Sequence, residues 1–120
     1  MRAVYGNIDG HPLRGMLPQT LIFNVEGVNV LLTHIGGYPG RYAPGIINKL
    51  RSENIGLFIS GHSHILKVMN DKTLNLLHIN PGAAGIYGFH KVRTLIRFTI
   101  DNGKFSNLEI MELACRDRAI

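Results

Sequence analysis

Short runs of β-branched and aliphatic residues, separated by turn-forming residues, constrain the fold of this chain most strongly. The 120 residues include 14 glycines and 5 prolines. Runs of four to eight such residues bounded by turn formers are typical of strands rather than helices. The expected strands cover residues 20–25, 28–33, 57–60, 66–69, 74–79, 94–100 and 104–113. The sequence therefore predicts a fold dominated by β-sheet.

One stretch has helical periodicity. Ile46, Ile47 and Leu50 fall on one face, and Pro44 suits the first position of a helix that ends near residues 54–56. Residues 34–43 are expected to form a loop, and tight turns are expected at 26–27, 70–72 and 101–103. Residues 2–5 resemble the end of a strand. The predicted class is α/β (α+β) in a single domain over residues 1–120.

Composition argues against several classes of function. The 13 basic and 8 acidic residues give a net charge of +5, but the basic residues are scattered from Arg2 to Arg118, so nucleic-acid binding is disfavoured. The single cysteine, Cys115, cannot form an internal disulfide. No apolar run reaches the ~20 residues that a membrane helix needs, and no signal-peptide pattern opens the chain. We expect a cytoplasmic protein without a membrane segment.

Potential metal ligands follow several of the predicted strands. Asn7 follows the opening segment, His34 follows residues 28–33, and His62 and His64 follow residues 57–60. Open α/β sheets bind ligands beyond the carboxyl ends of their strands, and imidazole is the commonest metal ligand in proteins. An isolated histidine is more often a surface or core residue than a metal ligand. Their joint placement, however, predicts a metal site.

The order of these motifs resembles a known family. Gly6-Asn7-x-Asp9 is followed by Thr33-His34, by Gly61-His62-x-His64 and by Asn80-Pro81-Gly82. This order is similar to that of the calcineurin-like metallophosphoesterases, specifically the small bacterial and archaeal phosphodiesterases that are related to the retromer small subunit. The resemblance covers residues 4–113 and implies part of a four-layer α/β/β/α sandwich that lacks the first strands and helices, about two-thirds of the whole fold.

The resemblance also implies roles for individual residues. Asn7, His34 and His62 would bind one metal, and His64 would bind the other. Asp9 would orient a ligand or the attacking water, and Asp9 and His34 are the candidate catalytic residues. The implied reaction is hydrolysis of a small phosphate ester by a hydroxide that bridges two divalent metals, with manganese as the first choice and zinc, iron or nickel as alternatives.

The chain departs from the family pattern in two places. The family begins with Asp-x-His on its first strand and Gly-Asp on its second, but only six residues precede Asn7, and none of the four aspartates stands in either position. The chain alone is therefore expected to bind metal weakly and to be inactive. Ile8 also replaces the histidine that in many relatives protonates the leaving group.

Other readings stay open. The main alternative is a non-catalytic scaffold like the retromer small subunit, which recruits protein partners; a homo-oligomer is also possible. His11, Arg14, Arg41 and Tyr42 are candidates for contact with phosphate, although ordinary exposed loop positions are the more favoured reading of all four. His78 lies within an apolar strand and is expected to be structural, and no motif surrounds His90 or Cys115.

Overall fold

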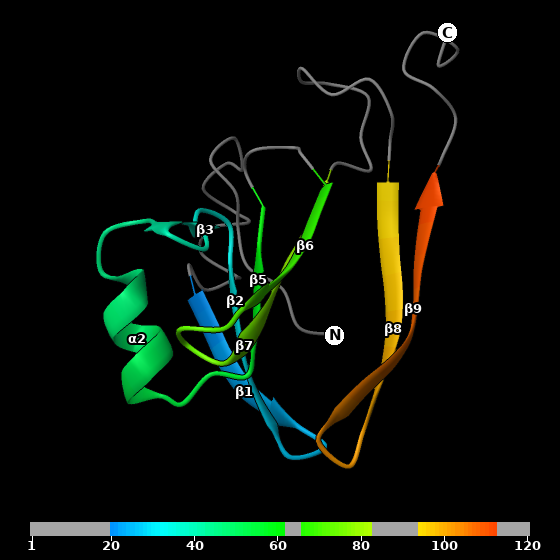
Figure 1. Cartoon of the computed structure of the whole chain (residues 1–120), viewed down its shortest axis with the longest axis horizontal. Helices are drawn as coiled ribbons and strands as arrows, with labels where there is room; N and C mark the ends of the chain where they lie inside the picture. Colours follow the sequence, from blue (N-terminus) through cyan, green and yellow to red (C-terminus); the bar gives the residue numbers. More distant parts are fainter. Residues whose placement is uncertain (1–19, 62–65, 83–93, 113–120) are drawn as a thin grey trace, which may run out of the picture.

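The computed structural model describes residues 20–61, 66–82 and 94–112. Their elements form three layers, in which a helix and a β-hairpin lie on opposite sides of a five-stranded sheet (Figure 1). The elements are β1 (Thr20–Val25), β2 (Val28–Thr33), β3 (Gly37–Tyr38), β4 (Arg41–Tyr42), α2 (Ile46–Ser52), β5 (Leu57–Ser60), β6 (Leu66–Asp71), β7 (Leu76–Pro81), β8 (Thr94–Asp101) and β9 (Lys104–Glu112). The α/β class is confirmed.

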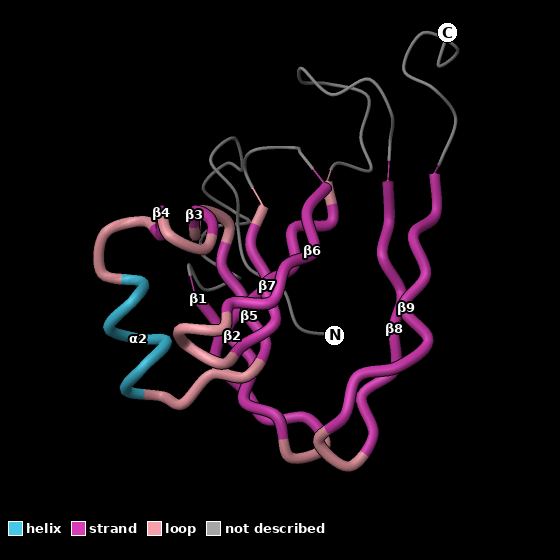
Figure 2. The backbone as a smooth tube through the Cα atoms, in the orientation of Figure 1, coloured by secondary structure: helices cyan, strands magenta, loops and turns pink. Residues whose placement is uncertain are grey.

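The five-stranded sheet has the order β1-β2-β5-β7-β6 (Figure 2). Its three central strands, β2, β5 and β7, are parallel, while β1 and β6 pair antiparallel at the two sides. The carboxyl ends of the three central strands therefore meet at one edge. We call this edge, formed by residues 33–34, 60–61 and 80, the strand-end edge.

Alternation along the central strands separates two cores. On one face, Leu31 and Phe58 pack with Ile46 and Leu50 of α2. On the other face, the cluster is built from Val28, Val30, Leu57 and Ile79, and it packs against Ile96, Phe98, Ile100 and Phe105 of the β8–β9 hairpin. We call these the helix face and the hairpin face. Because successive side chains in a strand point to opposite sides, both faces can be buried at once.

Most of the predicted strands are confirmed, but the helix is shorter than expected. It begins at Ile46 because Gly45 has φ of 82°, a left-handed conformation that no helical residue adopts, so Pro44 lies outside it. Among the described residues, no helix is long and apolar enough to cross a membrane.

Two loop predictions were wrong. The segment expected to be a loop contains the two-residue strands β3 and β4, which are too short to leave a periodic signal. The turn expected at residues 70–72 occurs later, so β6 continues to Asp71. The Asp71 carboxylate accepts the backbone N–H groups of Thr73 and Leu74, at 3.0 and 3.2 Å, and thus begins the turn rather than lying within it.

Candidate functional site

The parallel register brings His34, Gly61 and Asn80 to the strand-end edge. Thr33 of β2 is in register with Ser60 of β5, so the residues that follow them, His34 and Gly61, leave the sheet side by side. Strand β7 continues the same alignment, since Ile59 pairs with Ile79 and Asn80 is the next residue. Residues separated by up to 46 positions in sequence are thus neighbours.

His34 and Gly61 are in direct contact. The Gly61 N–H donates to the His34 carbonyl oxygen at 2.8 Å. A Cβ atom placed on Gly61 would lie 3.5 Å from His34 Nδ1, so the backbone of Gly61 lies against the imidazole ring. His62 is the next residue in the sequence after Gly61. The predicted ligand His34 is therefore held beside the start of the Gly-His-x-His segment.

The other predicted site residues, Asn7, Asp9, His62 and His64, lie outside the described residues. Within the described ranges, no group of three or more His, Cys, Asp or Glu side chains is placed to hold a metal ion. His34 is thus the one predicted ligand whose position the structure describes. The assignment of the remaining ligands stays a prediction.

Asn80 is a feature of the edge that the sequence motif marked only as part of a turn. Its side chain is buried, with 1% of its surface exposed, and Nδ2 donates to the Gly61 carbonyl oxygen at 3.3 Å. Its Oδ1 accepts the Gly82 N–H at 3.0 Å. The β7 end is therefore linked to the β5 end by a side chain.

The loop after His34 is pressed against the core. A Cβ atom on Gly36 would lie 2.2 Å from Phe58 Cζ and 2.8 Å from Ser60 Cβ, so only glycine fits there without a shift. The Gly36 carbonyl oxygen accepts the Ala43 N–H at 2.9 Å, which closes the loop around the β3–β4 pair. This packing determines the path of the chain as it leaves His34.

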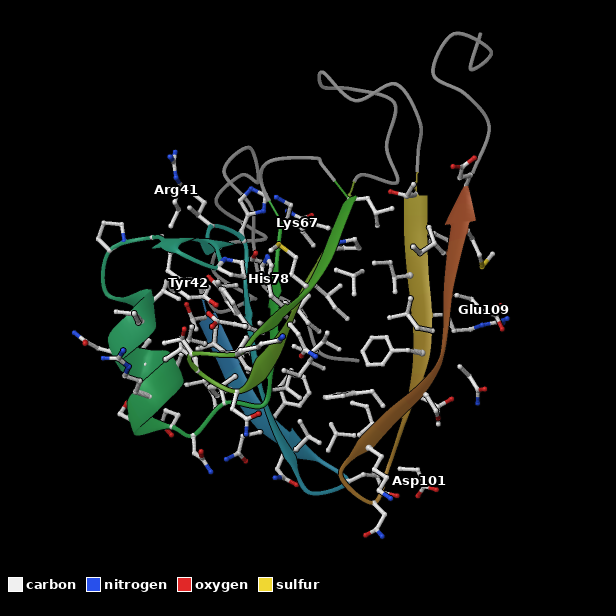
Figure 3. The ribbon with its side chains drawn as sticks, in the orientation of Figure 1. Arg41, Tyr42, Lys67, His78, Asp101 and Glu109 are labelled. Atoms are coloured by element: carbon white, nitrogen blue, oxygen red, sulfur yellow. The ribbon has the colours of Figure 1, made fainter. Side chains whose placement is uncertain are left out.

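His78 is a core residue, as expected from its strand position. It is fully buried on the helix face, and its ring centroid lies 5.1 Å from that of Phe58. Burial lowers the pKa of His78, assisted by the charge of Lys67 and opposed by a hydrogen bond with the Phe58 backbone and by the charge of Asp71. The imidazole is consequently neutral near pH 7. Figure 3 shows His78 among the side chains of the sheet.

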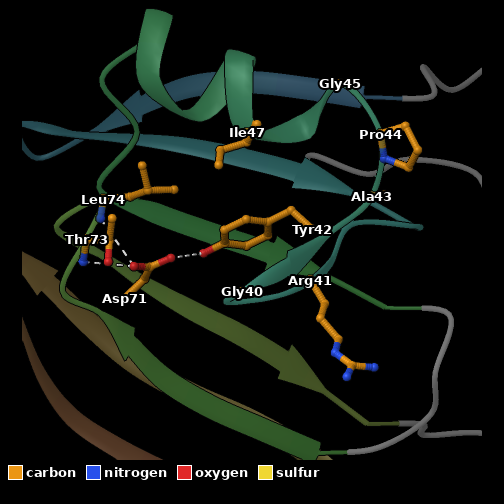
Figure 4. Close-up of a pocket in the computed structure, with 10 residues that line it drawn as sticks. All are labelled: Gly40, Arg41, Tyr42, Ala43, Pro44, Gly45, Ile47, Asp71, Thr73 and Leu74. Atoms are coloured by element: carbon orange, nitrogen blue, oxygen red, sulfur yellow. Dashed lines mark hydrogen bonds between the residues drawn. The ribbon is translucent and has the colours of Figure 1, made fainter.

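Tyr42, a candidate for contact with substrate, instead has a structural role. Its hydroxyl donates to Asp71 Oδ2 at 2.5 Å (Figure 4). Its ring packs edge-on against Phe58. Burial, together with this bond and the charge of Asp71, raises the pKa of Tyr42 above its usual range. The Tyr42 hydrogen bond is the main cause that lowers the pKa of Asp71. Asp71 is therefore ionised and Tyr42 is protonated at neutral pH.

A pocket of about 370 Å³ adjoins this pair on the helix side of the sheet (Figure 4). Its walls include Ala43, Pro44, Ile47 and Leu74. Arg41 also borders it, but the exposed guanidinium points away from Asp71. The pocket is distinct from the strand-end edge, because Asp71 pairs with Leu76 at the opposite end of β7.

Comparison of the sequence with known protein families gives one match. The sequence profile of the "Calcineurin-like phosphoesterase superfamily domain" matches residues 1–103. A search of curated protein sequences found no match.

Several solved structures share the fold. A predicted phosphoesterase from Streptococcus pneumoniae has a TM-score of 0.72 at 20% identity, with 97% of this chain and 63% of that chain covered. Vps29 from Entamoeba histolytica, solved in complex with zinc, has a TM-score of 0.68 at 16% identity over 96% of this chain and 68% of that one. An archaeal phosphodiesterase has a TM-score of 0.64 at 17% identity, covering 92% and 67%. This chain thus spans about two-thirds of the length of these structures.

Proposed function

Because this chain belongs to the calcineurin-like phosphoesterase superfamily, we propose that it carries part of the centre of a metal-dependent phosphoesterase. The proposed metal ligands are Asn7, His34, His62 and His64, with Asp9 as the residue that orients a ligand or water. The observation that supports this most directly is the contact between His34 and Gly61 at the strand-end edge. The residue that precedes His62 lies against the first histidine of the proposed ligand set.

The donor chemistry fits divalent cations. His34 offers a neutral imidazole, and an asparagine oxygen with two further imidazoles forms a set that suits manganese, zinc, iron or nickel. When bound, two such cations polarise the phosphoryl oxygens and lower the pKa of water. The zinc complex of the similarly folded Vps29 supports zinc as a reasonable first probe.

The residues of this chain contribute mainly positioning. The β2 and β5 ends hold His34 beside Gly61, and the packing of Gly36 on Phe58 directs the loop that follows His34. Arg41 on β4 is an exposed cation within that loop, where it pairs with Tyr38 of β3. We assign it as a candidate to bind phosphate oxygens, for which a guanidinium provides paired donors.

A scaffold function is the second candidate, and a specific observation favours it. Leu95 and Met111 lie opposite each other on the outer side of the β8–β9 hairpin, with 38% and 41% of their surfaces exposed. Vps29 proteins are among the structures with the same fold. An exposed apolar pair of this kind suits contact with a protein partner.

Metal titration distinguishes the two functions. We expect the chain to bind manganese or zinc with weak affinity, measurable by calorimetry at millimolar metal, because the four proposed ligands are neutral imidazole and amide donors. The substitution His34→Ala should abolish binding. Ile35→Ala, at the adjacent and 45% exposed position, is the matched control and should leave binding unchanged.

The contrary result is equally clear. If the chain binds neither metal stoichiometrically, or if His34→Ala binds as tightly as the unmodified chain, the proposed metal centre is wrong. The scaffold would then be favoured. A slow hydrolysis of bis(p-nitrophenyl) phosphate that depends on added manganese and on His34 would extend the result from binding to catalysis.

A further inference from the structure

Asn80 carries a buried side-chain amide near the end of β7, a strand whose other buried residues are Leu76, His78 and Ile79. Only 1% of its surface is exposed. Burial of an amide is unfavourable unless its hydrogen-bonding groups are satisfied. Here Nδ2 donates to the Gly61 carbonyl oxygen and Oδ1 accepts the Gly82 N–H, at 3.3 and 3.0 Å. The side chain thus joins two segments that are not neighbours in sequence.

Gly61 is held from two sides by these bonds. Its carbonyl oxygen accepts from Asn80, and its N–H donates to the His34 carbonyl oxygen at 2.8 Å. A continuous series of hydrogen bonds therefore runs from the β7 end through the β5 end to the β2 end. Because His34 also has its ring against Gly61, a displacement of Gly61 would change the surroundings of that ring.

We propose that Asn80 is a positioning residue, which fixes Gly61 against His34 and thereby sets the geometry of the strand-end edge for metal binding. This role rests on the proposed function and extends it to a residue that is not itself a metal ligand. Groups that orient metal ligands through hydrogen bonds typically change metal affinity 10- to 100-fold when they are removed. Asn80 would act through the backbone of Gly61, which it bonds and which lies against the proposed ligand His34.

The amide is required because both of its ends are used. An aspartate at this position would keep the acceptor for Gly82 but would lose the donor to Gly61. An alanine would leave the Gly61 carbonyl oxygen and the Gly82 N–H without the bonds seen here. Both replacements release Gly61 from β7, and only the aspartate adds a buried charge.

Thr94 of β8 provides a control, because it bonds the same segment, residues 80–82, at a different residue. Its Oγ1 donates to the Pro81 carbonyl oxygen at 2.7 Å, and 7% of its surface is exposed. A Cβ atom on Gly82 would lie 2.2 Å from that Oγ1, so the turn is packed tightly against β8. Thr94→Val removes a buried hydrogen bond to the residue next to Asn80 without removing any bond to Gly61.

The test compares Asn80→Asp, Asn80→Ala and Thr94→Val in the full chain. We expect both Asn80 variants to speed hydrogen exchange of the Gly61 amide at least tenfold relative to β2 amides, and to shift the His34 ring resonances. We also expect their zinc affinity to fall 10- to 100-fold. Thr94→Val should lower the melting temperature but leave all three measurements unchanged.

The alternative outcomes separate this inference from the proposed function. If Thr94→Val weakens zinc binding as much as the Asn80 variants do, Asn80 acts through general stability and the inference is overturned. Unchanged exchange at Gly61 in Asn80→Ala overturns it as well. If the unmodified chain binds no zinc, the proposed function fails. Faster exchange at Gly61 would then still support local positioning by Asn80, but the metal-directed role would be refuted. Asn80→Ala keeps the test valid if the buried charge of Asn80→Asp prevents folding.

Discussion

The two faces of the five-stranded sheet differ in chemistry. The hairpin face is built from hydrocarbon side chains, with Val28, Val30, Leu57 and Ile79 packed against the β8–β9 hairpin. The helix face combines an apolar cluster with buried polar side chains at Thr33, Ser60, Asp71, His78 and Asn80. Three of these five residues, Thr33, Ser60 and Asn80, lie in the last two positions of a central strand.

The two faces therefore contribute differently to the stability of the fold. A buried polar side chain destabilises the folded state unless it is hydrogen-bonded, whereas burial of apolar side chains stabilises the folded state. The hairpin face therefore supplies stability. The helix face carries the groups that organise the strand-end edge, so changes on the two faces should differ in kind.

The largest expected effect comes from placing a polar group on the hairpin face. Leu57→Asn would remove a side chain that is 1% exposed and bury an amide among hydrocarbon neighbours. Leucine truncation in a core costs roughly 2–5 kcal/mol, and an unsatisfied amide adds about 1–3 kcal/mol. We expect urea denaturation to show no cooperative transition. A loss below about 1 kcal/mol would mean that the hairpin face is not a tight core.

A second prediction concerns the loop that covers the helix face. Gly36→Ala places a methyl group 2.2 Å from Phe58 Cζ, so we expect a loss of about 1–3 kcal/mol in unfolding free energy. Gly40→Ala is the control, because nothing lies within 4 Å of its Cβ position and only its φ of 83° opposes the change. That strain costs roughly 1–2 kcal/mol. Beyond stability, Gly36→Ala alone should weaken metal binding. Equal effects on metal affinity would contradict the proposed path of the loop.

The third prediction uses pH to examine the Tyr42–Asp71 bond. The pKa of Asp71 is lowered from its ordinary value of 3.8. The Tyr42–Asp71 bond therefore contributes its full stabilisation above pH 3.8, and this stabilisation is lost as pH falls through the folded-state pKa of Asp71. Tyr42→Phe should cost about 1.5–3 kcal/mol at pH 7, as is typical of a bond to a charged group. The difference from the unmodified chain should shrink below pH 3.8. A difference that is constant from pH 7 to 3 would show that the bond does not govern Asp71.

The smallest effect is expected on the outer side of the hairpin. Arg97 and Glu109 form an ion pair at 2.6 Å, but their side chains are 69% and 54% exposed. Exposed pairs contribute roughly 0–1 kcal/mol, so Glu109→Gln should change the unfolding free energy by less than about 0.5 kcal/mol. Thermal denaturation in low and high salt would check this. A larger effect would mean that the hairpin is stabilised from its outer side as well.

The strands and the location of His34 were readable from sequence because they depend on local periodicity. Residues 20–25 and 28–33 alternate or run apolar with turn formers between them, and both appear within the predicted bounds. The β3–β4 pair and the start of α2 were not predicted correctly. Two-residue strands have no period, and the left-handed Gly45 overrides the helical preference of Pro44 for the first position.

In the candidate site, too, the sequence indicated the individual residues but not their contacts. Gly61, His34 and Asn80 were each marked by a motif, but nothing in the motifs indicated that an Asn80 amide would bond the Gly61 carbonyl. Tyr42 and Asp71 carried no signal of their partnership, since 29 residues separate them.

By itself, the sequence determined the succession of short strands, the amphipathic helix that follows Pro44 and the order of the Asn, His and Gly-His-x-His motifs. These features depend on residue types a few positions apart. Only the tertiary structure decided that β2, β5 and β7 are parallel and in register, and that Asn80, Gly61 and His34 are joined at one edge. Strand pairing depends on contacts between segments that are distant in sequence, and these contacts stabilise the fold only when the segments have come together.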